Sequence, residues 1–392
     1  MRLVHVVPTY FPAVRYGGPI WSVHALCKAL VRRGHEVEVL TTSVDGPVDL
    51  DVPLGVPVDR DGVAVRYFPS HFLRRLYWSP PMARQFAEVL ADADFLHLHS
   101  IFLWPTSAAA RVSQRLEIPW CVAPRGALVP DLVRRRSTLA KRVWLGLVER
   151  RTIQQAAFLH VTSALEGEEA ARFGYALPPV RIVPNGVDIP VLNRPGGLLR
   201  DAVLPPGNGP LLLFLGRISW KKGLDRLIPA LAFLPTARLV IAGNDEENLA
   251  PRLEVLAREV GVAGRVRFVG QVTGDKKTAL LRAATLLVLP SYSENFGNVI
   301  LESLAVGRPV AMTAEVGLAS VVAEAGAGVI LPGDSAAMGQ ALAASLASPA
   351  CLDAMGARGR QFVERRYSWG TVAAEMEAAY IGAIRAKKKS VS

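Results

Sequence analysis

The sequence predicts an α/β protein built from two doubly wound domains. Three observations indicate this class. The chain has 392 residues, which exceeds what one hydrophobic core normally supports. Short, continuous apolar segments of the kind found in buried parallel strands recur along the chain. Amphipathic helical patterns lie between these segments, and the alternation of strand and helix occurs twice.

The first domain is expected to span residues 1–190. The first strand leads through a loop containing Gly17 and Gly18 into a helical pattern at residues 21–34, which ends at Gly34. Glycine is common just past the end of a helix, so it marks this boundary. The buried strands of this domain are predicted at residues 3–7, 37–41, 94–100, 120–124 and 158–162.

The second domain is expected to span residues 191–370, beginning with a Pro- and Gly-rich linker at 191–210. Residues 371–392 are a predicted helix and basic tail that return to the first domain. Because ligands of open α/β sheets bind beyond the carboxyl ends of the strands, the two domains are expected to face a deep cleft. Strands are predicted at residues 211–216, 238–243, 266–270 and 285–290, with a helix at 223–235.

The composition favours a globular protein. No stretch reaches the roughly 18 consecutive apolar residues that a membrane span needs. The N-terminal segment MRLVHVVPTYFP is typical of a buried strand and not of a signal peptide, so a cytoplasmic location is expected. Cys27, Cys121 and Cys351 are scattered without metal-ligand spacing, and they predict neither a disulfide framework nor a zinc site.

The formal net charge of +11 raises the question of an anionic partner. Residues 134–151 carry seven basic groups and one acidic group. Apolar residues at helical spacing, among them Leu139, Val143 and Trp144, make this segment a predicted basic amphipathic helix. It is either a solvated face or a contact with an anionic membrane surface. Nucleic acid is not an expected partner, because neither half of the chain is strongly basic and no recognition module is present.

The segment SYSENFGNVILESLAVG follows the strand at 285–290 and becomes an amphipathic helix that ends at Gly307. A helix that starts at the carboxyl end of a strand offers backbone N–H groups to an anion, and Gly297 allows a phosphate to approach closely. The carboxylates of Glu294 and Glu302 only accept hydrogen bonds when ionised. They are therefore expected to bind hydroxyl groups on either side of the anion.

Two cations are expected to hold the same anion. The strand at 211–216 is followed by Arg217, and the next loop carries Lys222. The planar fork of Arg and the mobile charge of Lys together suit a diphosphate. The loop of Gly17 and Gly18 offers a further close backbone approach. A diphosphate flanked by polyols describes a nucleotide sugar.

These motifs resemble those of the retaining glycosyltransferases of family 4, over essentially the whole chain. The resemblance implies the GT-B architecture, in which two Rossmann-like domains face the cleft. The residues that carry it are Gly17-Gly18, His97-Leu98-His99, Pro184-Asn185-Gly186-Val187-Asp188, Gly216-Arg217 with Lys222-Gly223, and Glu294-Asn295-Phe296-Gly297 with Glu302.

The resemblance also implies roles for single residues. The Glu corresponding to Glu294 contacts the donor sugar, and the one corresponding to Glu302 contacts the ribose. Arg217 and Lys222 correspond to the pair that holds the diphosphate. Many members have Gly where this chain has Asn295, which leaves the identity of the donor sugar open. Further donor contacts are expected from the phosphate cradle and the backbone beside the base, at Gly17, Gly18, Asn295, Phe296, Gly297, Asn298, Val299, Val269 and Val272.

His97 and His99 alternate with leucines, so both fall on one face of a strand. The resemblance places a His corresponding to His99 beside the reacting sugar. His99 is nearer the carboxyl end and is expected to reach the cleft, whereas His97 is expected in the core. No third residue has metal-ligand spacing, so no metal is expected. Arg125, after the strand at 120–124, is a predicted acceptor contact.

The predicted function is transfer of a hexose-type sugar, with retention, from a UDP- or GDP-sugar to a glycan or lipid-linked glycan in surface polysaccharide or glycolipid biosynthesis, at the inner face of the cytoplasmic membrane. The predicted catalytic residues are His99, Glu294, Arg217 and Lys222. No organic cofactor is expected.

Two alternatives remain at this point. A glycoside hydrolase would use Glu294 and Glu302 as its carboxylate pair, but this leaves the anion-binding groups without a role. A basic protein that binds membrane or nucleic acid would depend on residues 134–151. Each motif taken alone also fits a surface loop or a turn, and their combination favours the transferase.

Overall fold

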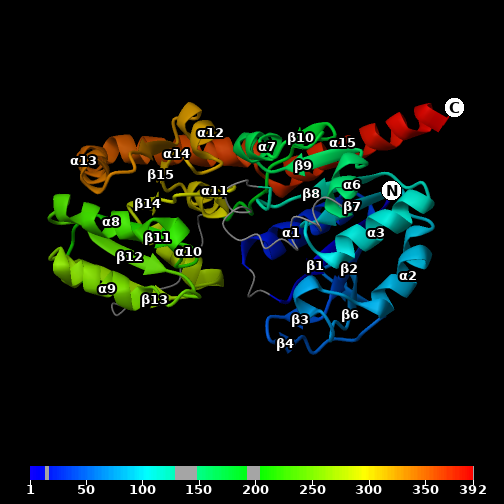
Figure 1. The fold of residues 1–392 in the computed structure, drawn as a ribbon. Coiled ribbons are helices and arrows are strands. Elements are labelled where there is room, and N and C mark those ends of the chain that lie inside the picture. Colours follow the sequence, from blue (N-terminus) through cyan, green and yellow to red (C-terminus); the bar gives the residue numbers. More distant parts are fainter. Residues whose placement is uncertain (14–16, 129–147, 192–203, 392) are drawn as a thin grey trace. The chain divides into compact units, whose positions relative to one another are not determined.

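The computed structural model describes residues 1–13, 17–128, 148–191 and 204–391. Most of the expected basic helix at 134–151 and of the linker at 191–210 therefore lies outside the described residues. The chain forms two compact units (Figure 1). Unit 1 consists of Met1–Gly186 together with Trp369–Ser392, and unit 2 consists of Val187–Ser368. Both divisions fall a few residues before the boundaries at 190 and 370 that the sequence suggests.

Unit 1 is built on an eight-stranded sheet in the order β10-β9-β8-β7-β1-β2-β6-β5. Its strands pair in parallel except at one edge, where β5 is antiparallel to β6. The strands of this sheet are β1 (Arg2–Thr9), β2 (Glu36–Thr42), β5 (Pro57–Arg60), β6 (Val63–Phe68), β7 (Phe95–His99), β8 (Trp120–Ala123), β9 (Phe158–Val161) and β10 (Val180–Ile182). The hairpin and the helices are β3 (Val44–Asp45), β4 (Val48–Asp49), α1 (Gly18–Arg32), η2 (Arg74–Leu76), α2 (Pro80–Leu90), α3 (Trp104–Arg115), α6 (Arg150–Gln154), α7 (Ala164–Ala171) and α15 (Trp369–Val391).

Unit 2 is built on a six-stranded parallel sheet in the order β13-β12-β11-β14-β15-β16. Its strands are β11 (Leu211–Leu215), β12 (Arg238–Ala242), β13 (Val266–Gly270), β14 (Leu286–Leu289), β15 (Val310–Thr313) and β16 (Gly328–Leu331). Its helices are η5 (Trp220–Lys222), α8 (Leu224–Ala230), η6 (Leu231–Phe233), α9 (Ala250–Glu259), η7 (Ala263–Arg265), α10 (Gly274–Ala283), α11 (Asn298–Ala305), α12 (Ala319–Glu324), α13 (Ser335–Leu346) and α14 (Pro349–Arg366).

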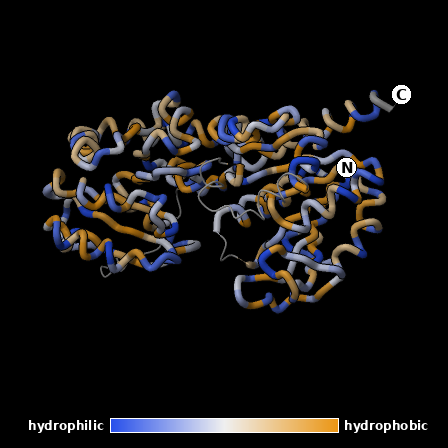
Figure 2. The backbone as a smooth tube through the Cα atoms, viewed as in Figure 1, coloured by the Kyte–Doolittle hydropathy of each residue, from blue (hydrophilic) through white to orange (hydrophobic). Residues whose placement is uncertain are grey.

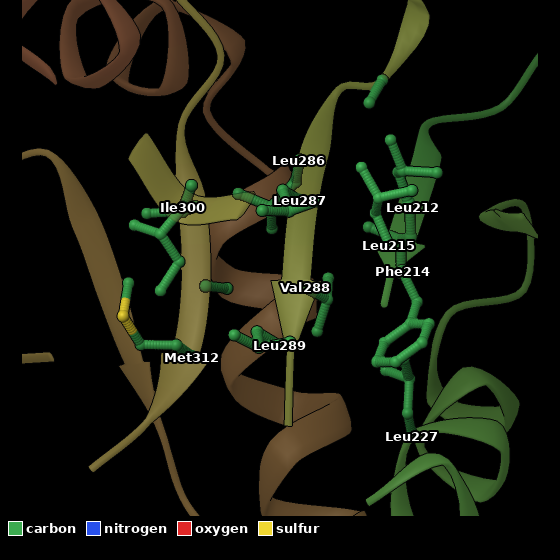
Figure 3. Packing of buried hydrophobic residues seen from close by; sticks show 14 of the residues in the cluster. Leu212, Phe214, Leu215, Leu227, Leu286, Leu287, Val288, Leu289, Ile300 and Met312 are labelled. Carbon is green, nitrogen blue, oxygen red and sulfur yellow. The ribbon is translucent and has the colours of Figure 1, made fainter. Parts of the chain in front are cut away.

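The core of unit 2 is the sheet itself. Every residue of β11 and β14 is buried, as expected for strands covered on both faces. Figure 2 shows hydrophobic residues along the strands of this sheet. In Figure 3, Phe214 and Leu227 pack on one side of β14 and Met312 lies on the other. This packing fixes the strand ends from which the functional loops leave.

Both sheets have a topological switch point, where neighbouring strands are distant in sequence. In unit 2 the strand order is the doubly wound order 3-2-1-4-5-6, and the switch lies between β11 and β14. In unit 1 it lies between β1 and β7. Connections leave a switch point toward opposite faces of the sheet, which opens a crevice beyond the carboxyl ends of the two strands. Open α/β sheets bind their ligands in such crevices.

The C-terminal helix α15 belongs to unit 1, where it packs on α1. Its inward side chains, Val372, Met376 and Tyr380, are at most 1% exposed. They join the hydrophobic cluster that contains Val23 and Leu26 of α1. The first unit is therefore completed by the last segment of the chain.

Candidate active site

The switch point of unit 2 brings a lysine and a glutamate together. The loop after β11 carries Lys222, and the loop after β14 carries Glu294. The ammonium of Lys222 forms an ion pair with the Glu294 carboxylate, and the two side chains are 15% and 20% exposed. Sequence reasoning assigned them to different parts of a ligand and did not foresee that they touch. Neighbouring strands at a switch point explain the contact, because their loops leave side by side.

Arg217 directly follows Gly216 at the end of β11, as the sequence indicates. Its side chain is 59% exposed, and Nη1 lies 3.4 Å from a carboxylate oxygen of Glu246. An exposed ion pair of this kind contributes little to stability. The guanidinium is therefore accessible from the solvent, and its contact with a diphosphate stays a prediction.

The backbone of Glu294 is fixed by the loop that follows β15. The Glu294 N–H donates to the carbonyl of Glu315 at 3.1 Å, and the Gly317 N–H donates to the carbonyl of Glu294 at 2.9 Å. Gly297 then precedes α11 with φ 92°, a left-handed conformation that favours glycine. A Cβ there would lie 3.1 Å from side-chain atoms of Ile300 and of Val316. Backbone conformation and packing therefore favour glycine at this position, and the approach of a phosphate to it stays a prediction.

The second carboxylate, Glu302, also has a lysine beside it. Lys277 Nζ, on α10, lies 2.9 Å from Glu302 Oε1, on α11. The two predicted residues next to the base lie just before α10. Val269 is half-buried at the end of β13, whereas the Val272 side chain is buried in the hydrophobic core. Only the backbone at Val272 is therefore suited to contact a ligand.

Arg226, on α8, was not predicted and lies beneath the Glu294 loop. It is 7% exposed. Its Nε donates to the carbonyl of Pro290 at 2.8 Å, and its guanidinium lies 3.9 Å from the ring centre of Tyr292. It ties the helix that follows Lys222 to the start of the loop that carries Glu294. The signal in the sequence is a charged residue at an inward position of the apolar segment LDRLIPA.

At the switch point of unit 1, four histidines from three strands form a buried cluster. His5 is on β1, His97 and His99 are on β7, and His160 is on β9. The rings of His97 and His99 stack with centres 4.0 Å apart, which confirms that both lie on one face of the strand. The sequence distinguishes His99 from His97 by exposure, whereas the structure leaves each 1% exposed. His5 of β1 lies beside both rings and His160 of β9 lies beside His97, which sequence spacing could not reveal.

The hydrogen bonds fix the tautomers of His97 and His160. His160 Nε2 lies 2.9 Å from the carbonyl of Val183, so this nitrogen must carry the proton. His160 Nδ1 then accepts from His97 Nε2 at 3.2 Å, and His97 Nδ1 accepts from the Tyr380 hydroxyl at 2.7 Å. The C-terminal helix is therefore the first donor of a directed chain that ends on a carbonyl group.

A second chain runs through His99. Arg125 can only donate, so His99 Nδ1 accepts from its Nη2 at 3.3 Å. His99 Nε2 then donates to His5 Nδ1 at 2.9 Å. Arg125 also donates to Asn185 Oδ1 at 2.9 Å, which links it to the PNGVD segment. The half-buried Arg125 thus holds its own unit together, and an acceptor contact stays a prediction.

Burial keeps these imidazoles neutral. Burial and the Arg125 guanidinium lower the pKa of His5 to about 3, and the same causes lower the pKa of His160 to about 3. The pKa values of His97 and His99 also lie well below the ordinary value, mainly because burial penalises the charged form. In this state the cluster acts through hydrogen bonds and not through charge.

His5 supplies the third imidazole that the sequence analysis did not find, and one ring nitrogen each of His5, His97 and His99 lies within 4.8 Å of the others. The surroundings of these three ring nitrogens nevertheless do not favour a metal cation. A metal would displace the hydrogen bond between His5 and His99 and would face the guanidinium of Arg125. The expected independence from metal stays a prediction.

The two segments predicted to form the phosphate cradle lie in different units. Gly17 is the N-cap of α1 with φ 79°, and Gly18 is the first residue of that helix. Gly297 is the N-cap of α11, and Asn298 and Val299 are the first two residues of that helix. Phe296 is buried, and Asn295 is half-buried. Each unit therefore carries its own set of candidate residues.

Comparison with known proteins identifies the class. Residues 198–362 match the family model of glycosyl transferases group 1, and residues 17–186 match the glycosyl transferase 4-like domain. The chain is 30% identical to the D-inositol 3-phosphate glycosyltransferase of Xylanimonas cellulosilytica, over 98% of this chain and 96% of that enzyme. It is 29% identical to the phosphatidyl-myo-inositol mannosyltransferase of Mycobacterium leprae, over 97% and 96%.

Solved structures agree on the fold. Sucrose-phosphate synthase from Thermosynechococcus elongatus superimposes with a TM-score of 0.75 at 23% identity, covering 98% of this chain and all of that one. Anabaena HepE, solved in complex with UDP and glucose, gives 0.73 at 18% identity, covering 97% of this chain and 100% of HepE. The fold is GT-B, with two Rossmann-like domains. The chain belongs to the group 1 glycosyltransferases of family 4, which decides against the hydrolase and the simple binding protein.

Among the described residues, no helix combines the length and the hydrophobicity that crossing a bilayer requires.

Proposed function

We propose that this glycosyltransferase transfers a hexose-type sugar from a nucleotide sugar, with a UDP- or GDP-sugar as donor, to a glycan or a lipid-linked glycan. The observation that carries the proposal is the meeting of Lys222 with Glu294 at the switch point of unit 2, where open α/β sheets bind ligands. HepE, which shares the fold, has been solved with UDP and with UDP-glucose. This supports a nucleotide-sugar donor.

The side chains of unit 2 suit the parts of such a donor. Lys222 and Arg217 supply positive charge for the diphosphate, and the N-terminus of α11 adds backbone dipoles. Glu294 accepts hydrogen bonds from sugar hydroxyls, and Glu302 accepts them from the ribose. Because Lys222 already neutralises Glu294, the carboxylate can lie near a diphosphate without strong repulsion.

We infer transfer with retention by substitution on the front face of the sugar. Charge develops on the departing diphosphate, and Arg217, Lys222 and the helix N-terminus stabilise it. The departing phosphate oxygen takes the proton of the acceptor hydroxyl as the new glycosidic bond forms. No carboxylate of unit 2 is needed as a covalent nucleophile, and Glu294 is held by Lys222. In this scheme His99 acts indirectly: its two ring nitrogens are bonded to Arg125 and His5, and it supports the position of Arg125.

The same scheme requires neither a metal ion nor a cofactor. Two cationic side chains and the dipole of α11 supply the charge that a metal would otherwise contribute. We therefore propose that activity persists in the presence of EDTA. A loss of activity that Mg²⁺ or Mn²⁺ restored would contradict this.

We further propose that the enzyme works at the inner membrane surface in surface polysaccharide or glycolipid biosynthesis, with residues 134–151 in contact with anionic lipid. The support is the basic, Trp-bearing sequence of this segment. Co-sedimentation with liposomes at low salt tests the contact. Equal recovery with neutral and with anionic liposomes would rule it out.

The donor is identified by thermal shift with UDP, GDP and ADP, followed by the corresponding sugars. A nucleotide that binds only the folded state at 100 times its Kd stabilises it by about 2.7 kcal/mol. We expect one of the three to raise the Tm, and Lys222→Ala to reduce that shift. NMR of the product then shows whether the anomeric configuration is retained. If none of the nucleotides raised the Tm, the proposed site would be wrong.

A further inference from the structure

The carboxylate proposed for the ribose has a neighbour without an assigned role. Lys277 Nζ lies 2.9 Å from Glu302 Oε1, and the two side chains are 32% and 28% exposed. Among the described residues, the second oxygen, Oε2, takes part in no hydrogen bond. One oxygen is thus held from within the protein while the other remains available in a partly open position.

The placement of Lys277 points to a function. It lies in the first turn of α10, where the helix dipole disfavours positive charge. An ion pair exposed to this degree contributes little to folding stability. Lys277 thus destabilises the start of the helix, and its ion pair with Glu302 adds little to the stability of the fold. This suggests that the pair serves ligand binding.

The position along the chain indicates which part of the ligand is concerned. α10 begins at Gly274, two residues after Val272, in the segment expected beside the base. α10 and α11 are in contact, so Lys277 joins the base segment to the ribose carboxylate. Lys222, by contrast, is paired with Glu294 at the switch point. Each acid has its own lysine, and the two pairs belong to different parts of the donor.

We propose that Lys277 is a positioning residue for nucleoside recognition, which holds the Glu302 carboxylate so that Oε2 accepts from the ribose hydroxyls. This rests on the proposed function, because it assumes that Glu302 faces the ribose. Lys277 acts through Glu302 and sets how strongly the enzyme distinguishes a ribose from a sugar that lacks the 2′ and 3′ hydroxyls.

The test measures Kd by calorimetry for the nucleoside diphosphate found by thermal shift and for its 2′,3′-dideoxy form. In the wild-type enzyme the hydroxyls bind a charged acceptor, so the dideoxy form is expected to bind about tenfold or more weakly. Lys277→Met is expected to weaken the ribose form about fivefold and to leave the dideoxy form unchanged. Lys277→Arg, which keeps the cation, restores most of the affinity for the ribose form.

Lys276→Met is the matched control, because Lys276 is exposed in the same turn of α10 and carries the same charge. It is expected to change neither Kd. If Lys277→Met weakened both ligands equally, or neither, the positioning role would be wrong. The variant Glu302→Gln distinguishes the positioning role of Lys277 from the binding of ribose by Glu302. If Glu302→Gln left the ratio of the two Kd values unchanged, Glu302 would not bind the ribose. If the ratio of the two Kd values fell to about one in Glu302→Gln but stayed at the wild-type value in Lys277→Met, Glu302 would bind the ribose without help from Lys277. The role of Lys277 alone would then be wrong.

Discussion

At the scale of single residues, the ion pair between Lys222 and Glu294 gives the lysine two tasks. Without a donor it neutralises the acid. In the proposed mechanism it also faces the diphosphate of the donor, where negative charge increases as the bond to the sugar breaks. A cation that is already in place does not need to reorganise during the reaction, and this makes it effective in stabilising the transition state.

Lys222→Ala is therefore expected to lower kcat by about 10²-fold or more, by analogy with the loss of one oxyanion-hole donor. Steady-state kinetics with the identified donor measures this. The neighbouring Lys221→Ala removes the same charge from the same loop and is expected to have a small effect on kcat. Equal losses in both variants would show that only the net charge of the loop matters.

The buried histidines make stability depend on pH. His5 and His160 have a pKa of about 3 in the folded state, against an ordinary value of 6.5 when unfolded. As the pH falls, these histidines therefore take up protons in the unfolded chain before they do so in the folded protein. Their titration leaves the free energy of unfolding unaffected above pH 6.5 and lowers it progressively between pH 6.5 and pH 3. Each such group lowers the free energy of unfolding by about 1.4 kcal/mol per pH unit in this range.

Urea unfolding at pH 7, 6 and 5 tests this before most carboxylates titrate. The free energy of unfolding is expected to fall steeply, and His160→Gln, which retains a donor for the Val183 carbonyl, is expected to reduce the slope. His71 is exposed, and His71→Gln is expected to leave the slope unchanged. A free energy that stayed constant from pH 7 to pH 5 would contradict the neutral state of the cluster.

The sequence alone predicted the candidate residues that stand in a motif. It did not predict the residues whose importance comes from a contact with a residue distant in the chain. Glu294, Glu302 and Lys222 stand in recognisable segments at strand ends. His5 and Lys277 acquire their neighbours only when strands and helices distant in the chain meet. Pattern and spacing along the chain contain no information about such pairs.

At the scale of elements, Gly223 shows how closely the two loops of the unit 2 site pack. It lies between η5 and α8 with φ 67°, and a Cβ there would lie 1.9 Å from the Pro290 carbonyl oxygen. Gly223→Ala is expected to lower the free energy of unfolding of unit 2 by more than about 2 kcal/mol, because backbone must move. Urea unfolding measures the change.

Gly264→Ala is the matched control, since a Cβ at Gly264 meets no atom within 4 Å. We expect it to stay within about 0.5 kcal/mol of the wild type. If the two variants were equally stable, α8 and β14 would not be as closely packed as the structure indicates.

Elements with long apolar runs were predictable, and short or alternating ones were not. β11 and β14 fall inside the expected segments at 211–216 and 285–290. β15 has only three apolar residues in a row, whereas all four residues of β14 are apolar, and β6 alternates between buried and half-buried positions, so neither β15 nor β6 gives a long apolar run. α1 begins at Gly18, earlier than the periodic pattern suggests, because Pro19 is well suited to the first turn of a helix.

At the scale of the whole molecule, α15 covers the core of unit 1. Removing residues 369–392 deletes Val372, Ala373, Met376 and Tyr380, each at most 1% exposed in the intact chain, and uncovers the part of the unit 1 core against which they pack. Burial of a large apolar side chain is worth about 1.5–3 kcal/mol. We therefore expect the shortened protein to lose the cooperative unfolding transition of unit 1 in calorimetry, while the transition of unit 2 remains.

A chain that ends at Lys387 keeps these side chains and is the control, expected to unfold like the full-length protein. Tyr380→Phe is a milder variant. It leaves His97 Nδ1 without its donor and is expected to cost about 1–3 kcal/mol. Unit 1 transitions that survived removal of the helix would show that α15 is dispensable for its folding.

The discontinuity of unit 1 has a consequence for biosynthesis. Residues 1–186 are translated first, yet the helix that covers their core is translated only after unit 2. Unit 2, made from one uninterrupted stretch, has everything it needs before translation ends. Domains usually mature in the order in which they are translated. Here unit 1 is translated first, but it becomes complete only after the whole of unit 2 has been made.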